Sequence, residues 1–238
     1  MSDKEIKDEP IVDLGGTISK SEQFFVQYKK PLLTAAVAVG LGAVVWVLYQ
    51  SQVVEPASVE ARKELWKAAD AFDKGNDTAA VKGVKKEFMG FEEIAEEYGN
   101  TNEGNIARYY LAVSYFKQKK FDQALEEIEA FDAKGEMLPH MKTTLIGDIY
   151  VEQNKNEEAL KKYVSAAKGA NNVLISPICL KKAAILSEQL GKNEDAIKYY
   201  EEIITAYYND PMKYGMEKQQ TEKALAVVKA KVALKEGK

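Results

Sequence analysis

Cysteine and histidine are almost absent from this sequence of 238 residues, which has one of each, Cys179 and His140. A single cysteine cannot form an intramolecular disulfide, and one thiol with one imidazole cannot build the usual Cys/His zinc site. Cys179 lies in an apolar-periodic segment, so we expect it to be a small core residue rather than a redox group. His140 follows Pro139 at the start of a predicted helix.

The motifs of common enzyme classes are also missing. There is no glycine-rich phosphate loop, no Gly-x-Ser-x-Gly, no His-Glu-x-x-His and no Cys/His nucleophile pairing. The 33 basic and 37 acidic residues give a net charge of −4, which offers nucleic acid no electrostatic attraction. We therefore predict no catalytic residue, no cofactor, no metal site and no nucleic-acid partner.

Charge is lacking altogether from Pro31 to Tyr49, a run of 19 residues. A helix of that length spans roughly 28 Å, close to the hydrocarbon core of a bilayer. Trp46 and Tyr49 fall at one end, where such rings prefer the headgroup zone. Six acidic residues precede the run and no small-x-small site follows it promptly, which argues against a cleaved signal peptide. We predict a retained transmembrane helix over residues 31–50.

The charges that flank this run predict its orientation. Lys29 and Lys30 adjoin its start, whereas the first basic residue beyond its end is Arg62. Basic residues remain on the cytoplasmic side, so residues 1–30 form a cytoplasmic, partly disordered segment and residues 51–238 form the extracytoplasmic domain. In a bacterium with two membranes that compartment is the periplasm.

Small residues recur within the apolar run with a spacing of four. They form two overlapping small-xxx-small patterns, which allow a second membrane helix to approach closely. The residues of this candidate membrane-helix contact are Ala36, Ala38, Gly40 and Gly42.

The sequence after the run repeats itself. Ala124, Ala159 and Ala196 are 35 and 37 residues apart, and each follows a similar apolar helical segment. Antiparallel helices approach closely where small side chains face each other. We therefore expect a crossing in each pair, with Ala112, Gly147 and Ala184 on the first helices opposite Ala124, Ala159 and Ala196 on the second. Polar turns separate the paired helices, and the predicted N-caps are Asp122, Asn156 and Asn193.

These segments resemble the tetratricopeptide repeat (TPR) family. The resemblance covers three repeats, at residues 105–138, 140–173 and 177–210. It departs from the family at the early tryptophan, where the chain has Arg108, Thr143 and Leu180.

Helical patterns also flank the three repeats. Residues 59–72 and 88–98 read as a degenerate first hairpin whose long connection, residues 73–86, departs from the tight TPR turn. Residues 216–235 read as a capping helix. The predicted fold is all-α, with one N-terminal transmembrane helix, a TPR-like α-solenoid of antiparallel helix pairs and a C-terminal cap.

The TPR resemblance implies which side chains line a concave peptide-binding groove, because in that family the first helix of each pair faces it. The candidate groove residues are Tyr109, Val113, Phe116, Lys117, Thr144, Asp148, Val151, Glu152, Lys181, Ile185 and Glu188. Such a surface suits a peptide with hydrophobic anchors. In the alternative reading, Tyr109, Val113 and Phe116 pack against the degenerate first hairpin.

The layout as a whole is similar to that of the YfgM-like ancillary proteins of bacterial inner membranes. That resemblance implies a scaffold or adaptor beside the Sec translocon, with translocon subunits, periplasmic chaperones and nascent exported chains as partners. Two alternatives stay open. One is a structural subunit of another envelope complex, in outer-membrane assembly or cell-division coordination; the other is a cytoplasm-facing adaptor, if the topology is inverted.

Overall fold

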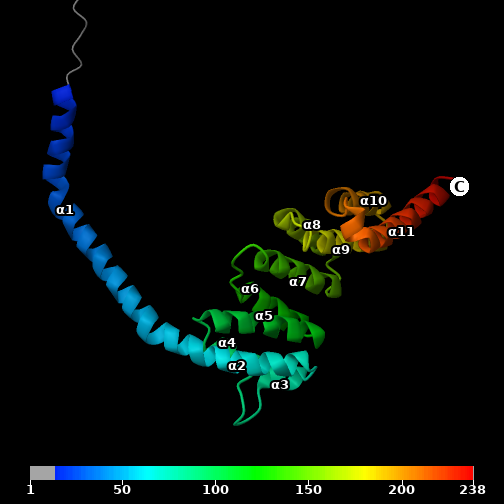
Figure 1. Cartoon of the computed structure of the whole chain (residues 1–238), viewed down its shortest axis with the longest axis horizontal. Coiled ribbons are helices and arrows are strands. Elements are labelled where there is room, and N and C mark those ends of the chain that lie inside the picture. The colour runs from blue at the N-terminus through cyan, green and yellow to red at the C-terminus, as the bar shows by residue number, and fades with distance from the viewer. Residues whose placement is uncertain (1–13, 238) are drawn as a thin grey trace, which may run out of the picture. The chain divides into compact units, whose positions relative to one another are not determined.

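The computed structural model describes residues 14–237, and its cartoon is shown in Figure 1. Within that range the regular elements are helices, apart from an isolated antiparallel bridge between Val84 and Phe88. The chain divides into two compact units, Met1–Pro56 and Ala57–Lys238. The predicted all-α fold is confirmed.

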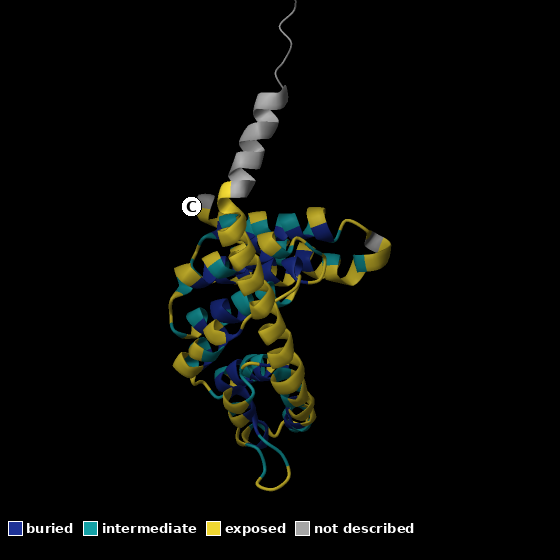
Figure 2. Ribbon diagram, turned by 90° about the vertical axis from the view of Figure 1, so that its left-hand side faces the viewer, coloured by how far each residue is buried: buried dark blue, intermediate teal, exposed yellow. Residues whose placement is uncertain are grey.

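The first unit contains the long helix α1, Leu14–Tyr49, and a π-helical turn, η1, Gln50–Val54. The helix that runs through this region is long and apolar enough to cross a membrane, and its apolar window has no buried residue. Figure 2 shows the same exposure along the ribbon. The helix begins at Leu14 and runs through Pro31, the first residue of the predicted transmembrane segment. Residues 1–13 of the predicted N-terminal segment lie outside the described residues.

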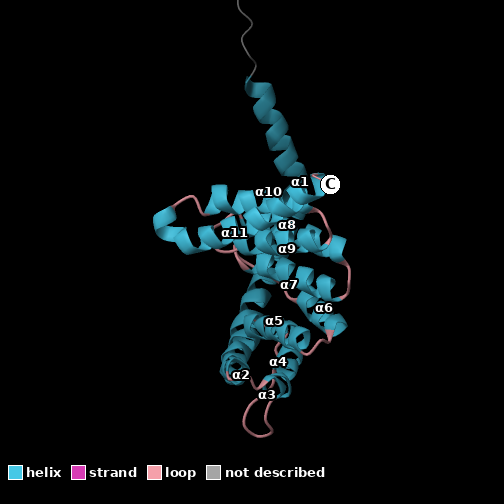
Figure 3. Ribbon diagram, turned by 90° about the vertical axis from the view of Figure 1, so that its right-hand side faces the viewer, coloured by secondary structure: helices cyan, strands magenta, loops and turns pink. Residues whose placement is uncertain are grey.

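The second unit is a stack of helix pairs, which Figure 3 shows joined by short loops. The three predicted repeats correspond to α5 with α6, α7 with α8, and α9 with α10. Their bounds are Asn102–Lys117 for α5, Phe121–Ala130 for α6, Leu138–Glu152 for α7, Asn156–Ala170 for α8, Ser176–Gln189 for α9 and Asn193–Glu202 for α10. A π-helical turn, η2, Ile203–Tyr207, extends α10.

Small residues hold the paired helices close together, as predicted. The alanines of the three crossings are fully buried: Ala112, Ala124, Ala159, Ala184 and Ala196. Gly147 is buried on α7, and a Cβ at this position would lie 2.7 Å from Cε1 of Tyr163 on α8. The ring of Tyr163 therefore occupies the space that a larger residue at 147 would need.

The predicted N-caps are wrong by one or two residues. The second helices begin at Phe121, Asn156 and Asn193, and their N-cap residues are Lys120, Lys155 and Lys192, which make no side-chain cap. The preceding turns contain left-handed residues: Lys119, Asn154 and Gly191, with φ of 61°, 60° and 73°. Because these turns close through backbone hydrogen bonds, Asp122, Asn156 and Asn193 fall inside the first helical turn instead.

The degenerate first hairpin consists of α2, Glu55–Asp73, and α4, Phe91–Glu97. Its long connection contains a short helix, α3, Asp77–Lys82, whose first turn is capped by the Asn76 side chain accepting from the Ala79 amide at 3.2 Å. Gly83 ends α3 with φ of 75°. The connection is therefore ordered around a capped helix, which the sequence pattern did not reveal.

The C-terminal cap is confirmed as α11, Pro211–Glu236, which is interrupted by a non-helical residue at Tyr214. Val228 is fully buried, and Ala224 and Leu225 pack against the apolar cluster of α9 and α10. The cap covers the apolar face that the last repeat would otherwise expose to solvent.

The crossing at Gly147 gives the first testable prediction. Gly147→Val should lower the stability of the domain by about 1–3 kcal/mol, because the added side chain must displace the ring of Tyr163 from a packed interior. Thermal unfolding followed by circular dichroism measures the effect. Gly215→Val is the matched control, since a Cβ at Gly215 meets nothing within 4 Å. Equal melting temperatures for the two variants would contradict the close crossing.

Candidate functional site

The candidate groove residues lie on α5, α7 and α9, the first helices of three successive pairs. Two contacts link α7 to α9: Thr144 Oγ1 lies 3.1 Å from Cys179 Sγ, and Lys182 Nζ donates to Asp148 Oδ1 at 2.7 Å. Cys179 is fully buried, as expected for a core residue, and burial raises the pKa of its thiol although Thr144 and Lys182 oppose that shift.

The α5 residues of the candidate groove are largely packed into the interior. Tyr109, Val113 and Phe116 are half-buried against the core cluster that α2, α4, α5 and α6 share. The rings of Tyr109 and Phe131 are 5.4 Å apart, and those of Phe116 and Phe121 are 5.9 Å apart. Burial raises the pKa of Tyr109. Both ring partners belong to the first repeat and its loop, rather than to the degenerate first hairpin that the alternative prediction names.

Lys117 lies at the end of α5 and is also engaged within the domain. Its Nζ is 3.5 Å from Asp77 Oδ1 and 3.8 Å from the centre of the Phe72 ring. Both partners belong to the degenerate first hairpin and its connection. Lys117 thus fastens α5 to α2 and α3 by an ion pair and a cation–π contact.

On α7, Asp148 is a junction between three helices. Its Oδ1 accepts hydrogen bonds from the Tyr163 hydroxyl of α8 at 2.6 Å and from Lys182 of α9 at 2.7 Å. Val151 packs against the cluster that surrounds Tyr163, whereas Glu152 is exposed. Asp148 therefore holds neighbouring helices together, and Glu152 is the freely accessible acid of this helix.

On α9, Glu188 makes an equivalent junction. It accepts from the Tyr200 hydroxyl of α10 at 3.0 Å through Oε1 and from Lys231 of α11 at 2.9 Å through Oε2. Burial raises the pKa values of Tyr163 and Tyr200, and their hydrogen bonds to carboxylates raise them further. Both phenols therefore remain protonated donors at physiological pH.

A third carboxylate, Glu92 of α4, repeats the arrangement with Tyr115 and Lys82. Burial acts to raise the pKa of Glu92, but the hydrogen bonds from Lys82 and Tyr115 outweigh it and leave the pKa below its ordinary value. Sequence reasoning missed these tyrosine–carboxylate–lysine ties. A tyrosine on a buried helix face is the sequence feature that could have revealed these contacts, because its hydroxyl requires a hydrogen-bond partner there.

The remaining candidate groove residues, Lys181 and Ile185, are exposed on α9. Ile178 lies on the same stripe, and the exposed fractions of Ile178 and Ile185 are 55% and 43%. The Lys231–Glu188 ion pair brings α11 alongside, where Val227 and Leu234 share the helical face of Lys231. We call the surface formed by Ile178, Lys181, Ile185, Val227 and Leu234 the α9/α11 face.

The candidate membrane-helix contact lies on α1. Ala36, Ala38, Gly40 and Gly42 are exposed there, and a Cβ at either glycine would meet nothing within 4 Å. The flank of the helix at these positions is open. No group of three or more His, Cys, Asp and Glu side chains that could hold a metal ion occurs in the described part of the chain.

A stack of helix pairs with small residues at each crossing defines a helical repeat protein. The family model described as "Tetratricopeptide repeat-like domain" matches residues 60–188, more than half of the chain. The chain belongs to this family. The matched range begins in α2, so it includes the degenerate first hairpin and ends near the end of α9. No curated protein matches the chain significantly.

The Asp148 junction gives a prediction about stability. Asp148→Asn should destabilise the domain by about 1–3 kcal/mol, because Lys182 loses its charged partner and the Tyr163 hydroxyl loses a charge-assisted acceptor in a partly buried site. Chemical denaturation measures the loss. Glu152→Gln, at an exposed position of the same helix, makes the same change of charge and should leave stability within about 0.5 kcal/mol. An unaltered Asp148→Asn protein would mean that this carboxylate is free for other roles.

Proposed function

We propose that this protein is a membrane-anchored scaffold that docks other proteins at the bacterial inner membrane. In this proposal α1 crosses the bilayer once, the N-terminus is cytoplasmic, and residues 51–238 form the periplasmic domain. The observation that carries the proposal is an apolar helix of membrane-spanning length joined to a TPR-like domain. Such repeats act through their surfaces, since each repeat contacts only its neighbours and leaves extended faces free.

The α9/α11 face supports a role in binding proteins. Its apolar side chains Ile178, Ile185, Val227 and Leu234 are 43% to 70% exposed, and Lys181 is an exposed residue of α9. Exposed apolar residues that lie together on a folded domain are a common mark of an interaction site. A peptide with apolar anchors gains by burying its own side chains against Ile178 and Ile185.

The proposed partners are subunits of the Sec translocon, periplasmic chaperones and nascent exported chains. Two lines of support favour them: the resemblance in layout to YfgM-like proteins, and the suitability of an exposed apolar surface for unfolded exported polypeptides. The stripe of Ala36, Ala38, Gly40 and Gly42 offers a membrane subunit a place of close approach. A structural role in another envelope complex uses the same surfaces and differs only in the partner.

Site-specific crosslinking distinguishes these partners. A photoreactive amino acid at Ile185 should capture translocon subunits, periplasmic chaperones or exported chains, because Ile185 is an exposed residue of the α9/α11 face. Mass spectrometry of adducts formed in intact membranes identifies them. The same probe at Ser165, an exposed residue of α8, is the control and should give few of these adducts. Adducts confined to outer-membrane assembly or cell-division proteins would favour the structural alternative.

Orientation is tested separately by cysteine labelling. Cys179 is fully buried and its thiol pKa is raised by burial, so a Cys179→Ser background removes little reactivity and leaves a clean baseline. In that background, Lys235→Cys should react with a membrane-impermeant maleimide once the outer membrane is permeabilised. Ser2→Cys should react only after the inner membrane is disrupted. The reverse pattern would establish the cytoplasm-facing adaptor.

A further inference from the structure

The outer side of α2 carries a surface that the proposed docking role does not use. Its residues are Val59, Arg62, Lys63, Trp66 and Lys67, which line a shallow hollow of about 470 Å³. Trp66 is 72% exposed and Val59 is 63% exposed. We call this surface the α2 face. An exposed tryptophan beside three cations is an unusual composition for a solvated helix surface.

The orientation of the α2 face is fixed by the opposite side of the helix. Ala61, Glu64 and Ala68 are buried there. Glu64 accepts hydrogen bonds from the Met89 amide at 2.9 Å and from Lys67 at 2.7 Å. Trp66 is therefore exposed because packing and hydrogen bonds direct the other side of α2 into the domain.

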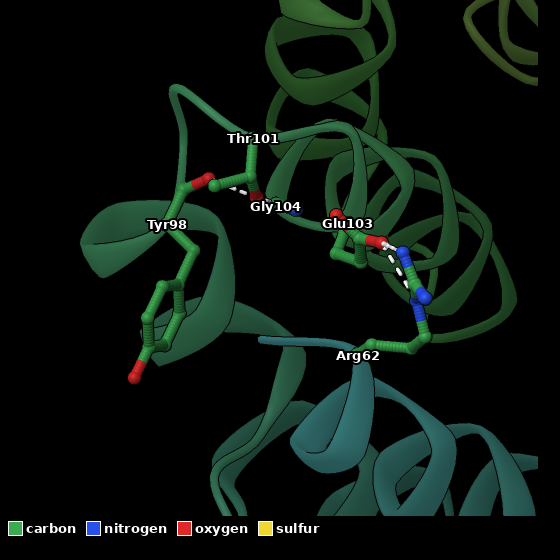
Figure 4. A network of polar contacts seen from close by, with 5 residues as sticks. All are labelled: Arg62, Tyr98, Thr101, Glu103 and Gly104. Atoms are coloured by element: carbon green, nitrogen blue, oxygen red, sulfur yellow. Dashed lines mark hydrogen bonds and ion pairs between the residues drawn. The ribbon is translucent and has the colours of Figure 1, made fainter. Parts of the chain in front are cut away.

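A second polar network joins α2 to the start of α5, as Figure 4 shows. Arg62 donates to Glu103 Oε1 from Nε at 3.0 Å and from Nη2 at 2.7 Å. Thr101 caps α5 by accepting from the Gly104 amide at 3.0 Å, and a Cβ at Gly104 would lie 2.0 Å from the Tyr98 carbonyl oxygen. Glycine at 104 thus permits the close turn that places Glu103 beneath Arg62.

These two networks bury the carboxylates that pair with Arg62 and Lys67. The carboxylates of Glu64 and Glu103 are buried, whereas the side chains of Arg62 and Lys63 are 71% and 65% exposed. An approaching surface therefore meets Arg62 before it meets Glu103, whereas Lys63 lies 3.9 Å from Glu60, whose side chain is 55% exposed. The long aliphatic parts of the arginine and lysine side chains lie beside Val59 and Trp66, so the face presents apolar and cationic groups together. Side chains at a membrane interface combine these two properties.

The α2 face follows the predicted transmembrane segment closely in the sequence. Val59 follows Tyr49 by ten residues and Trp66 follows it by 17, or roughly 15 Å and 26 Å along a helix. The π-helical turn Gln50–Val54 lies between Tyr49 and Val59, and such turns are positions at which helices bend. Only a short stretch of chain therefore separates Trp66 from the end of the apolar run.

We propose that the α2 face binds the headgroup zone of the membrane into which α1 inserts, with preference for anionic lipids. This inference rests on the proposed membrane anchor. Tryptophan concentrates at the membrane–water interface, and lysine and arginine near an anionic surface add attraction. A second copy of the chain is a poorer occupant, because a two-fold contact would bring the exposed cations of one α2 face against those of the other.

Tryptophan fluorescence tests the inference, since the chain has two tryptophans. A full-length Trp46→Phe protein, reconstituted in phosphatidylcholine vesicles with about a quarter phosphatidylglycerol, reports Trp66 alone. Brominated lipids should quench its emission, and the quenching should decrease at high salt or without phosphatidylglycerol. Lys63→Glu in this background should reduce the quenching at least twofold. Lys161→Glu, the same charge reversal at an exposed position of α8, should leave it unchanged.

A companion protein separates the two ways in which the inference can fail. Trp66→Phe leaves Trp46, which brominated lipids should quench strongly if α1 spans the bilayer. Quenching of Trp46 without quenching of Trp66 would leave the anchor intact and overturn the α2 face inference. Absence of quenching at both would overturn the anchor and the inference with it. A blue-shifted Trp66 that brominated lipids do not quench would assign the face to a second copy or a protein partner.

Discussion

The close approach of paired helices at alanine and glycine is the constraint on which the rest of the repeat domain depends. Ala112, Gly147 and Ala184 permit that approach, and large rings must then fill the layers beside each crossing. Tyr163 shows the consequence directly, because its ring occupies the space that the missing Cβ of Gly147 leaves free. A buried phenol requires an acceptor, so the carboxylate of Asp148 follows from the choice of tyrosine rather than from a requirement of binding.

The polar contacts between helices also determine which surfaces of the domain remain exposed. Glu92, Asp148 and Glu188 each bind a tyrosine and a lysine from other helices, and Lys117 pairs with Asp77. The side chains of α5 and α7 that make these contacts therefore hold the stack together. Exposed apolar side chains lie on α9 and α11 and on the outer side of α2.

The sequence predicted those features that depend on local spacing. Small residues at 124, 159 and 196, the buried Cys179 and the cap around Val228 all follow from helical periodicity and residue size. The N-caps were misplaced because a left-handed residue such as Lys119 closes each turn through its backbone, which side-chain chemistry does not reveal. Periodicity also cannot distinguish a ring packed on another helix from a ring that faces solvent, and Tyr109 and Phe116 illustrate that ambiguity.

The first hairpin differs from the repeats because it must join the stack to the apolar N-terminal helix. Its polar contacts, Arg62 with Glu103 and Glu64 with the Met89 amide, are made toward the domain. In the repeats, the corresponding polar contacts join helices that the next helix pair also covers on another side. No helix pair precedes α2 in this domain, so its outer face needs either polar residues or an occupant. Trp66 and Val59 are apolar at that position, and an end repeat meant only for solvent would carry polar side chains there instead.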